Sequence, residues 1–102
     1  MSNDIKEQVW YIRAVIEGRD DEVEEITDKW SLLEDALDIE YIISSTGEYL
    51  GARVLVTCGG PTIWVNTRTN TIEGTWWSDS YDLAFEDPFG IDDYLRDLHA
   101  CL

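Results

Sequence analysis

Basic residues, cysteine, histidine and long apolar runs are all scarce in this chain. Its 102 residues include 7 Lys or Arg, 2 Cys and 1 His. No stretch approaches the roughly 18 consecutive apolar residues of a membrane-spanning helix. The opening residues, Met1–Glu7, are polar and acidic and lack the apolar segment of a signal peptide. We therefore expect a cytoplasmic protein.

The two cysteines, Cys58 and Cys101, lie far apart in the sequence, and cytoplasmic proteins normally keep their thiols reduced. We expect both to be free; a disulfide that clamps the C-terminus is the alternative left open. Cys58 and the single His99 could form a nucleophilic pair. However, Cys58 continues the apolar face of Val54 and Val56, which favours a buried, unreactive thiol. His99, near a helix C-terminus, suits the helix dipole.

Metal-binding and phosphate-binding motifs are also missing. The stretch 66–70 has Arg68 where a calcium-binding loop needs an acid. Gly59 and Gly60 are not followed by the lysine and helix of a phosphate-binding loop. We expect a non-enzymatic protein with no catalytic residues, no metal ligands and no cofactor. A small enzyme that uses carboxylates as general acid and base is the alternative.

The shortage of bases leaves the chain strongly acidic, with 22 Asp or Glu, a formal net charge of −15 and a pI near 4.1. The chain lacks the basic patch that neutralises phosphates, so we expect no direct contact with nucleic acid. Hydrophobic residues make up 44% of the chain and aromatic residues 12%, which favours a folded protein over a disordered one. A merely solvated surface, or one adapted to salt, is the other interpretation of the charge.

Apolar residues at helical spacing predict two helices in the first third of the chain. The first stripe consists of Ile5, Val9, Ile12 and Ile16, and Gly18 ends this helix. Asp20 and Asp21 then favour the start of a second helix. Its apolar stripe consists of Val23, Ile26, Trp30, Leu33 and Leu37. Together the two helices form a predicted αα-hairpin.

From Ile39 onward, β-branched and aromatic runs broken by short turns predict an antiparallel meander of four strands. The strands are expected at 39–44, 53–58, 62–67 and 71–77. Residues 78–87 resemble a loop or irregular edge. Asp87 and Pro88 then suit the start of a last helix, whose stripe is Ile91, Leu95, Leu98 and Leu102. The prediction is one α+β domain over residues 1–102, in the order ααββββα.

The acids are concentrated in the predicted helices and the late loop. Residues 39–78 hold only 3 acids, whereas residues 1–38 hold 12 and residues 79–102 hold 7. Few bases relieve the repulsion between like charges at helical spacing, so we expect these acids to face a basic partner. They are Asp20, Asp21, Glu24, Glu25, Asp28, Asp35, Asp38, Asp79, Asp82, Glu86, Asp87, Asp92, Asp93 and Asp97.

Tryptophan is abundant, with five in the chain. Trp76 and Trp77 are adjacent in a predicted strand, and strand side chains alternate between the two faces. One of the two indoles is therefore expected to be exposed unless both sheet faces are covered. Trp77 is our candidate interface anchor, and packing over the sheet edge is the alternative.

The stretch Cys58–Gly74, followed by Trp76 and Trp77, resembles a hairpin in small proteins of bacterial mobile elements. The short length and acidity of the chain also resemble those of anti-CRISPR proteins, many of which occupy nucleic-acid-binding surfaces. The resemblance implies an inhibitor of a bacterial defence nuclease, with an RNA-guided type II nuclease as the expected partner. An immunity protein or antitoxin that neutralises a basic nuclease toxin is the alternative.

Overall fold

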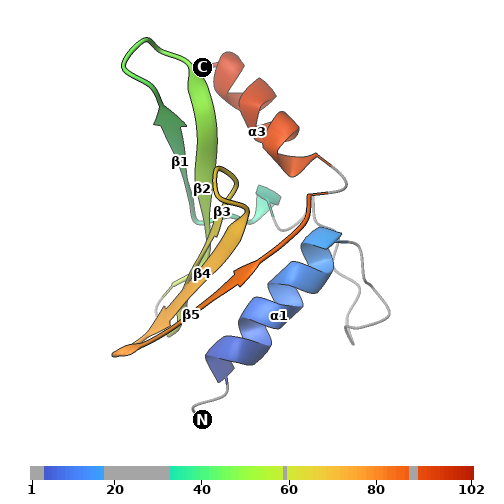
Figure 1. Cartoon of the computed structure of the whole chain (residues 1–102), viewed down its shortest axis with the longest axis vertical. Coiled ribbons are helices and arrows are strands. Elements are labelled where there is room, and N and C mark those ends of the chain that lie inside the picture. The colour runs from blue at the N-terminus through green and yellow to red at the C-terminus, as the bar shows by residue number, and fades with distance from the viewer. Residues whose placement is uncertain (1–3, 18–32, 59, 88–89) are drawn as a thin grey trace.

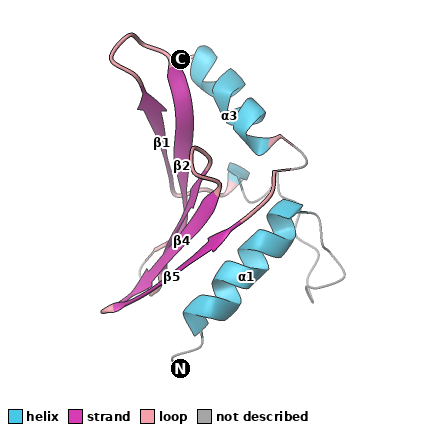
Figure 2. Ribbon diagram, viewed as in Figure 1, coloured by secondary structure: helices cyan, strands magenta, loops and turns pink. Residues whose placement is uncertain are grey.

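A computed structural model of the chain describes residues 4–17, 33–58, 60–87 and 90–102. Five antiparallel strands form one sheet in the order β1-β2-β3-β4-β5, so each strand pairs with its neighbour in sequence. The strands are β1 (Asp38–Ile43), β2 (Tyr49–Thr57), β3 (Thr62–Asn66), β4 (Thr71–Trp76) and β5 (Asp79–Ala84). Helices α1 (Asp4–Glu17) and α3 (Ile91–Ala100) complete the α+β fold that the sequence predicts (Figures 1 and 2).

The fifth strand, β5, contradicts the prediction that residues 78–87 form a loop or irregular edge. Considered alone, Asp is depleted in strands and Ser is common in turns. In the fold, however, Tyr81 and Leu83 pack against the core from alternate positions, and β5 pairs with β4 from Thr71↔Ala84 to Trp76↔Asp79. Pairing and burial therefore outweigh the local preference of these residues.

Most of the second helix of the predicted αα-hairpin lies outside the described residues, since these exclude 18–32. Its described end differs from the prediction. Leu33 is buried, but Leu37, expected on the same apolar stripe, is 61% exposed. The backbone N–H of Leu37 donates to the Leu55 carbonyl, and β1 begins at Asp38. The chain has thus left the helix by Leu37 and joined the sheet.

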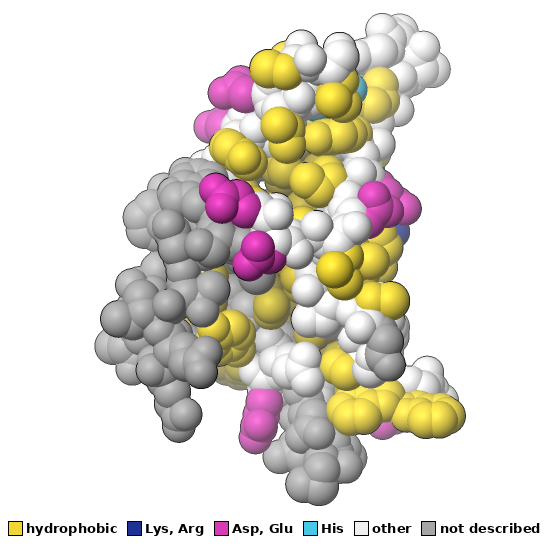
Figure 3. Space-filling view, turned by 180° about the vertical axis from the view of Figure 1, so that it is seen from behind, with side chains coloured by type: hydrophobic (Ala, Val, Ile, Leu, Met, Phe, Trp, Pro, Cys, Tyr) yellow, Lys and Arg dark blue, Asp and Glu magenta, His cyan; other side chains and the backbone are white. Residues whose placement is uncertain are grey.

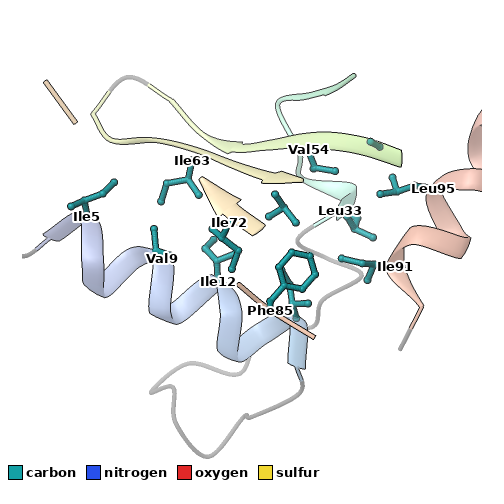
Figure 4. Packing of buried hydrophobic residues seen from close by; sticks show 13 residues of the cluster. Ile5, Val9, Ile12, Leu33, Val54, Ile63, Ile72, Phe85, Ile91 and Leu95 are labelled. Carbon is teal, nitrogen blue, oxygen red and sulfur yellow. The ribbon is translucent and has the colours of Figure 1, made fainter. Parts of the chain in front are cut away.

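Both described helices lie on the same face of the sheet. Helix α1 contacts β4 and β5, and α3 contacts β2 (Figure 1). The hydrophobic core fills the space between them, with Ile63 and Ile72 fully buried (Figure 4). Helix α1 lies so close to β4 that a Cβ on Gly74 would come within 2.9 Å of Ile5 and Val9. A residue without a side chain therefore sets the depth at which α1 docks.

Helix α3 begins later than predicted. Asp87 was expected as the N-cap and Pro88 as the first helical residue, but the helix starts at Ile91; Pro88 lies outside the described residues. Asp87 still caps the helix, because its two carboxylate oxygens accept the backbone N–H groups of Ile91 at 2.8 Å and Asp92 at 3.1 Å. Leu102, predicted on the buried stripe, is 86% exposed because α3 ends at Ala100.

None of the helices in the described part of the chain is long and apolar enough to cross a membrane.

Candidate protein-binding surface

The predicted partner-binding acids fall into three groups. Asp20, Asp21, Glu24, Glu25 and Asp28 lie outside the described residues. Asp35, Asp38, Asp79, Asp82, Glu86, Asp93 and Asp97 are exposed, as a charged binding surface requires. Asp87 and Asp92 are half-buried and bind other parts of the chain.

Asp92 links α3 to the sheet and does not face outward as a free charge. Its Oδ1 accepts hydrogen bonds from the Tyr49 hydroxyl at 2.9 Å and from the Thr67 hydroxyl at 2.7 Å. The Thr67 hydroxyl in turn accepts the backbone N–H of Ala52 at 2.9 Å. Like Asp87, Asp92 therefore has a structural role that explains its position, and the acidic surface is smaller than the sequence predicts.

The Tyr49 ring is enclosed by charged and aromatic neighbours on α3. The Arg96 guanidinium lies 5.4 Å from its centroid and the His99 ring 5.9 Å away. Burial first, and then the hydrogen bond to Asp92, raise the pKa of the Tyr49 hydroxyl above its ordinary value of 10.0. The folded protein therefore favours the neutral phenol.

This raised pKa predicts a loss of stability in alkali. Below pH 10 Tyr49 is protonated in both the folded and unfolded states, so the contribution of its hydroxyl to the free energy of unfolding is fully present. Above that pH the unfolded state releases the proton first, and the contribution falls. Urea unfolding at about pH 8 should show Tyr49→Phe less stable by about 1 kcal/mol, the usual value of a hydrogen bond. By about pH 11 this difference should narrow; a constant difference would contradict the assignment.

The exposed acids on the sheet lie near its two edges. On the face opposite the described helices, one row runs across all five strands. It consists of Asp38, Leu55, Trp64, Glu73 and Asp82, in that order. Asp38 and Asp82 are thus four strand spacings apart, roughly 19 Å. Acids and apolar side chains also share the surface seen in Figure 3.

The centre of this open face is neutralised by Arg53, a feature that sequence reasoning missed. Its guanidinium forms ion pairs with Glu40 at 3.1 Å and Glu73 at 3.3 Å, and lies 4.2 Å from the Trp64 ring centroid. These residues come from β1, β2, β3 and β4. Strand alternation assigns each of them to a face, but only the pairing register brings them together.

Most of the described bases are occupied in the same way. Arg13 pairs with Glu17, and Arg96 pairs with Asp92 and Asp93. The Lys6 ammonium lies 5.6 Å from the Tyr81 ring centroid. Arg96 therefore offsets the exposed Asp93 of α3, but no ion pair within the described residues involves Asp79, Asp82, Glu86 or Asp97. Along β5 and just beyond it, Asp79, Asp82 and Glu86 are all exposed.

Trp77 lies at the tip of the β4–β5 hairpin. Trp76 packs against the core, whereas the Trp77 side chain is 94% exposed. The expected exposure of one indole is confirmed, but its cause differs from the prediction. Strand β4 ends at Trp76, and Trp77 belongs to the two-residue turn that leads to Asp79.

The Cys58–His99 pair does not form. Cys58 follows the end of β2, and its thiol is free and exposed, so the prediction of a buried thiol is wrong. His99 lies against Tyr41 and Tyr49, the latter at the other end of β2. The nine-residue separation of Tyr49 and Cys58 along this strand corresponds to roughly 30 Å. Both thiols are free, as expected, and Cys101 is also exposed.

Within the described ranges, no group of three His, Cys, Asp or Glu side chains is placed to hold a metal ion. The chain matches no protein-family model, and neither the curated proteins nor the solved structures include a significant match.

Proposed function

We propose that this protein is a non-enzymatic inhibitor that binds a basic, nucleic-acid-binding groove of another protein. The observation that carries the proposal is the exposed surplus of carboxylates. Described bases such as Arg13, Arg53 and Arg96 already bind carboxylates of the chain. The ion pairs within the described residues leave out the exposed acids Asp79, Asp82, Glu86 and Asp97. These acids present a negative field for which a basic surface is the natural complement.

The scale of the charge also supports competition with nucleic acid. The molecule is 44 Å along its longest axis, a length over which B-DNA displays roughly 26 phosphate charges. The net charge of −15 is of the same order. Binding driven by such charge is steered at long range and weakens as salt rises, because screening shortens the reach of exposed charges.

The partner that we propose is a bacterial defence nuclease, and an RNA-guided type II CRISPR nuclease is the first to test. This choice depends on the resemblance in size, charge and the Cys58–Gly74 hairpin. The acidic surface is equally suited to a basic nuclease toxin, in which case the protein would be an immunity protein.

A pull-down tests the proposal directly. The tagged protein is incubated with lysate of bacteria that express a type II CRISPR nuclease, and bound proteins are eluted from about 50 mM to about 500 mM salt. We expect the nuclease to elute within this gradient and to lose DNA binding when the protein is added back. Recovery of a small basic toxin would instead indicate immunity. Recovery of no specific protein would contradict the proposed function.

A further inference from the structure

The Trp77 side chain has no structural role that explains its position. Its indole projects from the β4–β5 turn with 94% of its surface exposed, so burial does not hold it there. Hydrophobic side chains project at the lower right of Figure 3, where this hairpin tip lies. The backbone of Trp77 has a φ of 57°, in the left-handed region that bulky residues rarely adopt. Glycine or asparagine would suit such a turn better.

Two other tryptophans of the chain, Trp10 and Trp64, each lie beside an arginine that also pairs with a carboxylate. The Arg13 guanidinium lies 5.2 Å from the Trp10 ring centroid, and its Nε lies 3.4 Å from Glu17. Around Trp64, as described above, Arg53 stacks on the ring and pairs with two glutamates. In both places a planar guanidinium lies over an indole and also donates to a carboxylate, through Nε of Arg13 and through both terminal nitrogens of Arg53.

The tip of the β4–β5 hairpin supplies two of these three groups, the indole and the carboxylate. Asp79 follows Trp77 by two residues, is exposed, and forms no ion pair with any described side chain. An arginine fits Trp77 and Asp79 better than a lysine does, because its flat guanidinium can stack on the indole and bind the carboxylate at the same time. We propose that Trp77 and Asp79 receive an arginine side chain of the basic partner.

This inference rests on the proposed function, since it names the group of the partner that the surface recognises. The neighbouring charge supports it. Asp82 and Glu86 continue the acidic character of the hairpin beyond Asp79, and both are exposed. Long-range attraction would bring a basic surface to this edge, and stacking on Trp77 would then select arginine.

Calorimetric titration with nona-arginine and nona-lysine peptides at low salt tests the inference without any nuclease. The wild-type protein should bind nona-arginine about two- to fivefold more tightly than nona-lysine, as expected for one exposed cation–π contact. Trp77→Gly should abolish this preference without lowering Tm, because glycine tolerates the positive φ. Trp77→Phe should keep part of it. Asp79→Asn should weaken nona-arginine binding more than nona-lysine binding.

The matched control is Leu102→Ala, which removes another apolar side chain, 86% exposed. It should leave the preference unchanged. In NMR spectra, the indole N–H resonance of Trp77 is identified by its absence from the spectrum of Trp77→Gly. This resonance should shift when nona-arginine is added. Equal peptide affinities in wild type and Trp77→Gly would overturn the inference. The inference would also be overturned if Trp77→Gly reduced self-association of the protein but left its affinities for the two peptides unchanged.

Failure of this inference can be separated from failure of the proposed function. A nuclease that is inhibited equally by wild type and Trp77→Gly would leave the inhibitor proposal intact and exclude the arginine contact. Arginine selectivity with no nuclease bound at any salt would leave the contact intact and exclude the inhibitor.

Discussion

Neutralising three acids along the β5 edge is expected to weaken inhibition of the partner nuclease about 3- to 140-fold. The variant combines Asp79→Asn, Asp82→Asn and Glu86→Gln. An exposed ion pair contributes roughly 0.2 to 1 kcal/mol, so three of them contribute about 0.6 to 3 kcal/mol, and 1.4 kcal/mol is about tenfold in affinity. The measurement is the protein concentration that halves DNA binding by the nuclease recovered in the pull-down.

The control changes the same amount of charge at the opposite edge of the sheet. Asp35→Asn, Asp38→Asn and Glu48→Gln neutralise three exposed acids in or near β1, far from the β4–β5 hairpin. If β5 forms the contact, this variant should lose less affinity than the β5-edge variant, because only its net negative charge is lower. Equal losses in both variants would mean that total charge matters and the β5 edge does not. Full inhibition by the β5-edge variant would contradict the proposed surface.

Gly51→Ala is expected to cause the largest loss of stability among single substitutions that add only a methyl group. A Cβ on Gly51 would lie 2.6 Å from the Cβ of Arg68 and 2.8 Å from its Cα. Backbone cannot move aside as easily as the end of a side chain, so the turn after β3 would be pushed away from β2. Next to this turn, Thr67 connects β2 to Asp92 and α3.

We expect Gly51→Ala to lower the free energy of unfolding by about 2 to 3 kcal/mol, the upper part of the range for overpacking. This corresponds to a fall in Tm of roughly 10 °C or more for a domain of this size. Thermal and urea unfolding measure both quantities. Gly60→Ala is the control, because a Cβ there meets nothing within 4 Å. Similar Tm values for both variants would contradict the close approach at Gly51.

Local patterns in the sequence were sufficient for much of the fold. The stripe Ile5, Val9, Ile12 and Ile16 is fully or almost fully buried, because helical periodicity alone decides which side of α1 is apolar. The strand runs from Ile39 onward were located correctly to within a few residues, apart from an earlier start for β2 at Tyr49. Asp87 was placed at the N-cap position, which is Gly90 in the structure, but its carboxylate does accept free N–H groups at the start of α3, as predicted for a capping acid.

For the candidate surface, the sequence determined charge but not position. It showed an acidic chain with few bases and a conspicuous pair of tryptophans. Strand alternation could not show that Trp77 occupies a turn, because that depends on β5 pairing with β4. It also could not show that Asp92 binds Tyr49 and Thr67, which are 43 and 25 residues away.

The sequence by itself therefore determined the α+β class, the positions of α1 and four of the strands, and the net negative charge, because each depends on neighbouring residues or on composition. Only the tertiary structure decided that residues 79–84 form β5, that Leu37 is exposed, and that Arg53 joins Glu40, Glu73 and Trp64. The physical reason is the same in each case. Strand register and helix docking bring together residues far apart in the chain, and the energy of those contacts exceeds local preference.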